Sequence, residues 1–248
     1  MGVQHLKRED GETIAYLKRD GSAPCFVWLG GFNSDMMGTK AEALDIWARE
    51  RRRAYVRFDY FGHGQSSGEF RKGTISRWRD DALDVLDRLC EHPQILVGSS
   101  MGGWIAILAA LARPAKVKGL LLLAPAPDFT DALMWADMSD EVRQQIMDKG
   151  EWQRPSAYGE DPYPITRNLI EDGRKNLILG GPIALSCPVR IIQGMADPDV
   201  PWQHAMKLVE KIEGDPVITL VRRGNHRLST EEDLARMQNA LDTIISEI

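Results

Sequence analysis

A serine between two glycines stands where a buried strand gives way to a helix. The segment 98–102 (Gly-Ser-Ser-Met-Gly) follows the apolar run 94–97 and precedes the helical run 103–112. A strand, a Gly-x-Ser-x-Gly turn and a helix form the context in which a serine acts as a nucleophile. Glycine fits the two flanking positions because larger side chains would clash there, and the helix N-terminus favours a developing oxyanion. We therefore predict Ser100 as a nucleophile; an ordinary glycine-bounded turn is the alternative.

A serine hydroxyl needs a base at neutral pH, and the base needs an orienting group. Of the five histidines, only His226 lies in a loop directly after a predicted strand and after a candidate acid. Such loops gather at the carboxyl edge of an open parallel sheet, where Ser100 also projects. His226 is therefore the predicted base, and a solvated loop histidine is the alternative.

Three aspartates compete for the role of the orienting acid. Asp197 lies four residues beyond the predicted strand 189–193 and gives the chain order Ser, Asp, His, as in Gly-x-Ser-x-Gly hydrolases. Asp199 is better placed to cap the helix that follows, and Asp128 comes after an earlier strand. We favour Asp197 and keep the other two as alternatives.

The loop after the predicted strand 54–58 contains another Asp and His, namely Asp59 and His63. This loop lies too early in the chain for the order Ser, Asp, His. We therefore expect Asp59 to accept backbone hydrogen bonds in a rigid loop.

Two backbone amides are expected to stabilise the oxyanion, those of Phe32 and Met101. Two glycines precede Phe32 and permit its loop to fold back toward Ser100, although a simple turn is the alternative. His226 would take the proton of Ser100 during attack on an acyl carbonyl, and water would then release the acid from an acyl-enzyme. No metal-ligand spacing or phosphate-binding loop is present, so we expect neither a metal nor a cofactor.

Eight strand-like runs set the positions of these residues. Between them lie amphipathic helical runs, and this alternation predicts an α/β fold with a mostly parallel sheet covered by helices on both faces. The first two runs read as a hairpin. The runs are 4–8, 13–18, 25–29, 54–58, 94–97, 117–124, 189–193 and 217–221.

The alternation stops between residues 126 and 186, where no clear strand is predicted. We expect a mainly helical cap over Ser100, here called the cap segment (126–185), inserted into a hydrolase core of 1–125 and 186–248. Its apolar side chains could line an acyl pocket, although a position in the core of the cap is the simpler interpretation. They are Met134, Trp135, Met138, Trp152 and Tyr163.

The bulk composition is that of an ordinary globular chain. Of its 248 residues, 43% are hydrophobic and 27% are charged, and the formal net charge is −5. No basic stripe suggests nucleic acid as a partner, and the apolar runs are too short to span a bilayer. Three cysteines without a Cys-x-x-Cys pair indicate reduced thiols in a cytoplasm-like compartment.

The chain resembles the α/β-hydrolase superfamily, and within it the abhydrolase-domain-containing 10 family. The resemblance rests on five stretches that together span nearly the whole chain. They are 32–41, 57–62, 94–104, 200–202 and 226–227. It implies an eight-stranded α/β-hydrolase fold, the triad Ser100, Asp197 and His226, and oxyanion amides at Phe32 and Met101.

The family comprises mitochondrial serine hydrolases of S-palmitoylated protein cysteines and acyl glucuronides. The resemblance therefore implies a serine esterase or thioesterase acting on a small-molecule or acylated-protein substrate. With no transit peptide before the first strand, we expect a bacterial cytoplasmic form or a mature form of the mitochondrial matrix. The cap segment matches the family least, so the substrate is the weakest part of this inference.

Two other functions stay open at this stage. A protein with the same fold and triad could cleave another bond, such as a carbon–carbon bond or a lactone. It could also be a receptor that turns its ligand over slowly. Dehalogenase or epoxide hydrolase chemistry is disfavoured, because those relatives carry an aspartate where Ser100 stands. The oligomeric state cannot be read from the sequence.

Overall fold

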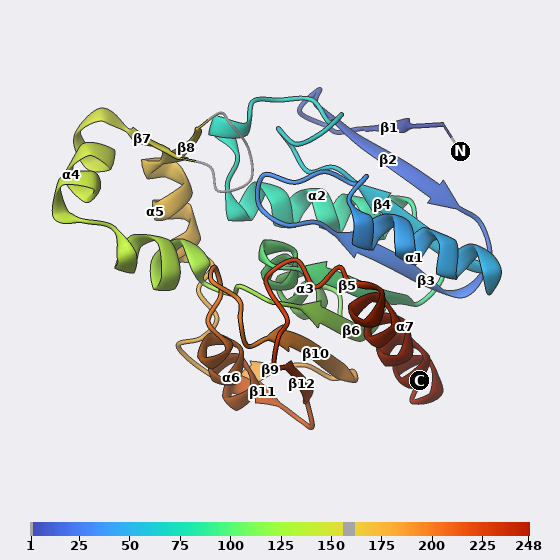
Figure 1. Ribbon diagram of the computed structural model, residues 1–248. Helices are drawn as coiled ribbons and strands as arrows, with labels where there is room; N and C mark the ends of the chain where they lie inside the picture. Colours follow the sequence, from blue (N-terminus) through green and yellow to red (C-terminus); the bar gives the residue numbers. More distant parts are fainter. Residues whose placement is uncertain (1, 156–161) are drawn as a thin grey trace.

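The computed structural model describes residues 2–155 and 162–248 and is built around one large sheet (Figure 1). The eight strands of this sheet are β1 (Gln4–Lys7), β2 (Thr13–Arg19), β3 (Ser22–Leu29), β4 (Arg53–Phe58), β5 (Gln94–Ser99), β6 (Val117–Leu123), β10 (Val189–Gly194) and β12 (Val217–Val221). Their spatial order is β1-β2-β4-β3-β5-β6-β10-β12. β2 runs antiparallel to both β1 and β4, and every other neighbouring pair is parallel. The predicted eight-stranded, mostly parallel sheet is confirmed.

In the described ranges, seven α-helices and two short helical turns accompany the strands. They are α1 (Thr39–Glu50), α2 (Ile75–Arg88), α3 (Met101–Ala112), α4 (Asp140–Lys149), α5 (Arg167–Lys175), α6 (Trp202–Lys211) and α7 (Glu231–Ser246), with the turns η1 (Phe70–Lys72) and η2 (Thr130–Trp135). Within the described ranges, no helix has the length and apolar character that crossing a membrane requires.

Both faces of the sheet are buried under helices. In β3, Phe26 and Trp28 join a cluster that contains side chains of α1 and α7. Val27 and Leu29, which point the opposite way, join a cluster with side chains of α2, α3 and α6. Because successive side chains of a strand alternate between faces, a strand buried on both faces is apolar throughout. This explains the continuous apolar runs in the sequence.

The strand register brings the carboxyl ends of the central strands to one edge. Gly98 of β5 lies opposite Leu29 at the end of β3, and Ser99 lies opposite Leu123 at the end of β6. Farther along the sheet, Gly194 at the end of β10 pairs with Val221 at the end of β12. The loops that follow these strands therefore start side by side.

The turn between β5 and α3 depends on contact between bare backbones. A Cβ atom on Gly102 would lie 2.0 Å from the carbonyl oxygen of Leu29, and one on Gly98 would lie 2.3 Å from that of Gly102. Helix α3 therefore starts directly against the end of β3. The predicted need for glycine at these two positions is confirmed.

The cap segment contains more than helices. Helices α4 and α5 and the turn η2 lie in it, but β7 (Glu151–Arg154) and β8 (Tyr163–Thr166) also form an antiparallel pair, and β9 (Ile183–Ala184) pairs with β11 (Ile212–Glu213). The expectation of no strand between residues 126 and 186 was wrong. β7 is mostly polar and β8 contains a proline, which an edge strand tolerates, so neither has the apolar pattern of a buried strand.

An apolar cluster forms the centre of the cap segment. Its buried members are Ile146, Ile165 and Ile170. The five side chains considered for an acyl pocket all pack around it, as does Phe32 of the core: Met134, Trp135, Met138, Trp152 and Tyr163. This packing favours a role for them in the core of the cap. The division of the chain into a core and a cap stays a prediction.

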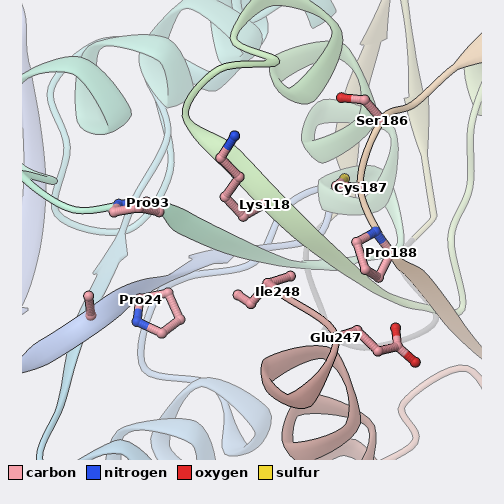
Figure 2. Close-up of a pocket in the computed structure, with 9 residues that line it drawn as sticks. Pro24, Pro93, Lys118, Ser186, Cys187, Pro188, Glu247 and Ile248 are labelled. Carbon is pink, nitrogen blue, oxygen red and sulfur yellow. The ribbon is translucent and has the colours of Figure 1, made fainter.

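A cavity of about 520 Å³ lies at the opposite edge of the sheet from the loops just described (Figure 2). It is lined by residues near the amino ends of parallel strands, among them Pro93, Lys118 and Pro188. Cys187 also lines it and is half-buried, whereas Cys25 and Cys90 are buried; all three thiols are free.

The backbone contact at Gly102 predicts a strong effect of one methyl group. We expect Gly102→Ala to lower the free energy of unfolding by about 1–3 kcal/mol, because the added Cβ has no room beside a carbonyl oxygen. Urea denaturation measures this change. The control is Gly180→Ala, since nothing lies within 4 Å of a Cβ atom at Gly180. An equal loss in both variants would contradict the packing argument.

Candidate active site

Ser100 stands between the last residue of β5 and the first residue of α3. Its backbone has φ 54° and ψ −119°, a positive φ that L-residues rarely adopt. Three backbone hydrogen bonds hold this conformation: Ser100 N–H donates to Leu123 O at 3.0 Å, and Ser100 O accepts from Gly103 N at 2.9 Å and from Ala126 N at 3.1 Å. Backbone strain of this kind persists where the surroundings enforce it, commonly at functional sites.

Ser100 begins a chain of hydrogen bonds between three side chains from three loops. Its Oγ lies 3.1 Å from Nε2 of His226, in the loop after β12. Nδ1 of His226 lies 2.8 Å from Oδ2 of Asp197, in the loop after β10. The structure thus brings together the three side chains that were predicted to act together.

The environment of Asp197 keeps its carboxylate ionised. The side chain is fully buried. Burial alone would raise the pKa of Asp197, but the hydrogen bond and charge of His226 and the N–H donors of Val200 and Asp199 outweigh it and hold the pKa below the ordinary value. An ionised Asp197 accepts the Nδ1 proton of His226, which leaves Nε2 free to accept a proton from Ser100.

The loops that carry Asp197 and His226 are joined backbone to backbone. A Cβ atom on Gly194 would lie 2.3 Å from the carbonyl oxygen of Gly224, so the two loops touch where neither has a side chain. Ala196 N donates to Gly224 O at 3.0 Å, and Met195 N donates to Val221 O at 2.9 Å. The separation of the acid and the base is therefore fixed by the main chain.

The two competing aspartates have other roles. Asp128 accepts hydrogen bonds from Ile178 N at 2.9 Å and Leu179 N at 2.9 Å, so it ties the end of the cap segment to the residues after β6. Asp199 is exposed, and its backbone N donates to Asp197 Oδ1 at 2.8 Å. The Nδ1 atom of His226 faces Asp197, as the order of residues along the chain predicted.

Asp199 does bring a second carboxylate close to the imidazole. Three potential metal-ligand atoms lie within 4.8 Å of one another, one from each of Asp197, Asp199 and His226. Such a spacing could hold a metal ion. Two of these groups already share the 2.8 Å hydrogen bond described above. We therefore interpret the cluster as a proton-sharing pair with a neighbouring carboxylate.

Asp59 and His63 serve the loop between β3 and α1. Asp59 accepts from Met36 N at 2.7 Å and from Gln65 N at 2.8 Å, the backbone role expected for it. His63 Nε2 accepts from Asn33 N at 3.1 Å, and Nδ1 lies 3.1 Å from Phe61 O. Burial lowers the pKa of His63 to about 4, so the ring is neutral at pH 7 and can accept this bond. The role of His63 as a support for the loop of Phe32 was not predicted.

The loop of Phe32 lies beside Ser100, as the oxyanion prediction requires. A Cβ atom on Gly31 would be 3.5 Å from Cβ of Ser100. The ring of Phe32 is held by four aromatic rings at centroid distances of 5.0 to 5.8 Å, those of Phe70, Trp78, Phe129 and Tyr163. Met101 is the first residue of α3, so its N–H belongs to the helix end that lacks intrahelical acceptors.

Lys40 supports the loop of His226 from the other side of the site. Its Nζ donates to the carbonyl oxygen of Arg227, the residue next to His226. Burial lowers the pKa of Lys40 to about 8, although the charges of Asp197 and Asp233 act in the opposite direction. This contact was not predicted. A lysine in the first turn of a helix opposes the helix dipole, and that mismatch is the signal that could have revealed it.

Comparisons with known proteins identify the family to which the chain belongs. A model of the alpha/beta hydrolase family matches residues 26–237. The mitochondrial palmitoyl-protein thioesterase ABHD10 of Mus musculus is 36% identical over 248 residues, which cover 99% of this chain and 83% of that protein. The Homo sapiens protein of the same name is 35% identical, and the match covers 99% of this chain and 81% of that protein. Both names include the mitochondrial location that the resemblance implied for eukaryotic members.

Two solved structures match over nearly their full length. A protein from Agrobacterium vitis S4 superimposes with a TM-score of 0.94 at 46% identity, covering 98% of each chain. Alpha/beta hydrolase domain-containing protein 10 from mouse superimposes with a TM-score of 0.92 at 34% identity, covering 100% of this chain and 99% of that chain. The chain therefore belongs to the α/β-hydrolase family, and within it to the group that contains the palmitoyl-protein thioesterase ABHD10.

Proposed function

We propose that this protein hydrolyses thioesters and carboxylic esters through an acyl-enzyme at Ser100. The observation that carries the proposal is the hydrogen-bonded chain from Ser100 through His226 to Asp197, with distances of 3.1 and 2.8 Å. The proposal assigns Ser100 as the nucleophile, His226 as the general base and Asp197 as the acid that orients it. The backbone amides of Phe32 and Met101 are assigned to the oxyanion.

The same groups act in both half-reactions, with His226 first as a base and then as an acid in each. Nε2 of His226 takes the Ser100 proton as Oγ attacks the acyl carbonyl carbon, and the two amides stabilise the negative oxygen. The imidazolium then gives this proton to the leaving thiol or alcohol. In the second half, His226 takes a proton from water, whose oxygen attacks the acyl carbonyl carbon. The imidazolium then returns this proton to Oγ of Ser100 as the acyl–oxygen bond breaks, which releases the carboxylic acid and restores the enzyme. The side chain of His226 is 18% exposed, so water can reach it.

The substrate class follows from the relatives and from the cap segment. The ABHD10 proteins are named palmitoyl-protein thioesterases, and they match almost the entire chain. An acylated protein thiol is therefore the substrate that we propose, with small acyl esters as further substrates. An apolar cap beside the Phe32 loop is compatible with an acyl group at this edge of the sheet.

The proposal predicts that Ser100→Ala abolishes hydrolysis while the fold survives. We expect kcat to fall by at least about 10⁴-fold, because the acyl-enzyme cannot form without Oγ. The measurement is hydrolysis of 4-nitrophenyl esters from acetate to palmitate and of an S-palmitoylated peptide. The neighbouring serine offers a matched control, and Ser99→Ala should keep turnover.

The outcomes of this experiment separate the remaining functions. Turnover that rises with acyl chain length supports a lipid thioesterase or esterase, and a short-chain optimum indicates small esters. Wild-type protein without turnover above the Ser100→Ala blank would contradict the proposal and favour a receptor or the cleavage of another bond. Turnover retained in Ser100→Ala would remove Ser100 from the mechanism.

The assignment of the acid is tested by a pair of isosteric substitutions. Asp197→Asn should lower kcat by about 10³- to 10⁴-fold, because a neutral amide no longer holds His226 in the required tautomer. Asp199→Asn is the matched control, and we expect its kcat to stay within about threefold of wild type. A larger loss for Asp199→Asn than for Asp197→Asn would assign the role to Asp199.

The neutral His63 predicts a loss of stability in acid. Its pKa of about 4 in the folded protein lies below the ordinary 6.5. Between these pH values the unfolded chain binds a proton that the folded protein does not, so lowering the pH destabilises the fold. The free energy of unfolding should fall on the order of 3 kcal/mol across this pH range. Urea denaturation at pH 7 and 4.5 should show a smaller loss for His63→Gln than for wild type. His92→Gln, at an exposed histidine, should keep the wild-type dependence; equal losses in all three proteins would refute the argument.

A further inference from the structure

The eight-stranded sheet ends at β12, and no strand formed by residues 2–155 or 162–248 pairs with the outer side of β12. β12 has the sequence Val-Ile-Thr-Leu-Val, with no charge, proline or glycine. Its side chains are unusually open for an apolar strand: Val217 is 43% exposed and Leu220 is 38% exposed. Such a strand edge presents unpaired backbone N–H and C=O groups and is a template for pairing with another chain.

The two ends of β12 carry opposite charges. Glu213 and Asp215 precede the strand, and Arg222 and Arg223 follow it directly. All four side chains are exposed, and no ion pair found within residues 2–155 and 162–248 includes any of them. The strand therefore has an acidic end and a basic end, with an uncharged stretch between them.

We propose that a second copy of this chain pairs with β12 in antiparallel orientation across a two-fold axis. Only an antiparallel arrangement of two identical strands sets the acidic end of each copy beside the basic end of the other. A parallel arrangement would place like charges together, which is unfavourable for directly opposed residues. The charge pattern thus selects both the partner and its orientation.

A two-fold axis at Thr219 gives a self-complementary interface. Val217 then lies opposite Val221 of the other copy, and Ile218 lies opposite Leu220. The same register sets Asp215 opposite Arg223 of the other copy. The two sheets join into one continuous sheet, and the backbone N–H and C=O groups at the open edge of each β12 become paired.

This interface would adjoin the active site without covering it. His226 lies five residues beyond the end of β12, so the pairing holds the strand from which the His226 loop starts. Ser100 opens at the carboxyl edge of the sheet, whereas the proposed contact lies along its side. The second copy therefore restrains the base of the loop and leaves the nucleophile accessible.

Sedimentation equilibrium of the full chain tests the proposal through charge reversal. We expect wild type to show the mass of two chains. Reversal of the basic end in Arg222→Glu/Arg223→Glu, or of the acidic end in Glu213→Lys/Asp215→Lys, should each give the mass of one chain. An equimolar mixture of the two variants should regain the mass of two chains, since each then supplies the charge that the other needs.

The control carries the same change in net charge as Arg222→Glu/Arg223→Glu, but away from β12. Lys149→Glu/Lys175→Glu alters two exposed side chains of the cap segment and should stay dimeric. Far-ultraviolet circular dichroism verifies that each variant is folded. A wild type that is monomeric at all concentrations up to about 100 μM would overturn the proposal. The charges that flank β12 would then serve to oppose its aggregation with other chains. Dimers that persist in both reversed variants would also overturn it, because they would use another surface.

Discussion

The direct contact of backbone with backbone at the start of α3 is the constraint on which the rest of the site depends. A side chain at Gly102 would meet the carbonyl oxygen of Leu29 at 2.0 Å, so α3 can start this close to β3 only with glycine there. The resulting sharp turn holds Ser100 at a positive φ and lifts it from the end of β5. The base, the acid and the oxyanion amides must therefore be positioned relative to this turn.

Asp197 and His226 are positioned beside Ser100 because main-chain contacts fix the loops that carry them. The loops after β10 and β12 touch at Gly194 and Gly224, and two backbone hydrogen bonds join them. Asp197 is then oriented by the N–H groups of Asp199 and Val200, at 2.8 and 2.9 Å. Sheet register rather than side-chain packing therefore sets the separation between the acid and the base, and a sheet is far stiffer than a surface loop.

The sequence predicted the parts of this structure that leave a local pattern. Strands buried on both faces appear as continuous apolar runs, and the rule that loops gather at the carboxyl edge of a parallel sheet predicts that Ser100 and His226 lie close together. The pairing of β7 and β8 was missed because β7 is mostly polar and β8 contains a proline, so neither short strand has such a pattern. The supporting contacts of His63 and Lys40 were missed because they join residues 30 and 187 positions apart.

Phe32 belongs to two apolar clusters, that of the sheet and helices and that of the cap segment. Among the described residues of the β7–β8 pair, Tyr163 of β8 places its ring against that of Phe32, with the ring centroids 5.8 Å apart. A ligand that displaced Tyr163 would remove one of the ring contacts that hold Phe32. It would thereby loosen the backbone amide of Phe32, which we assign to the oxyanion. The identity of residue 163 is therefore constrained from two directions, by its packing around Ile146, Ile165 and Ile170 and by its contact with Phe32.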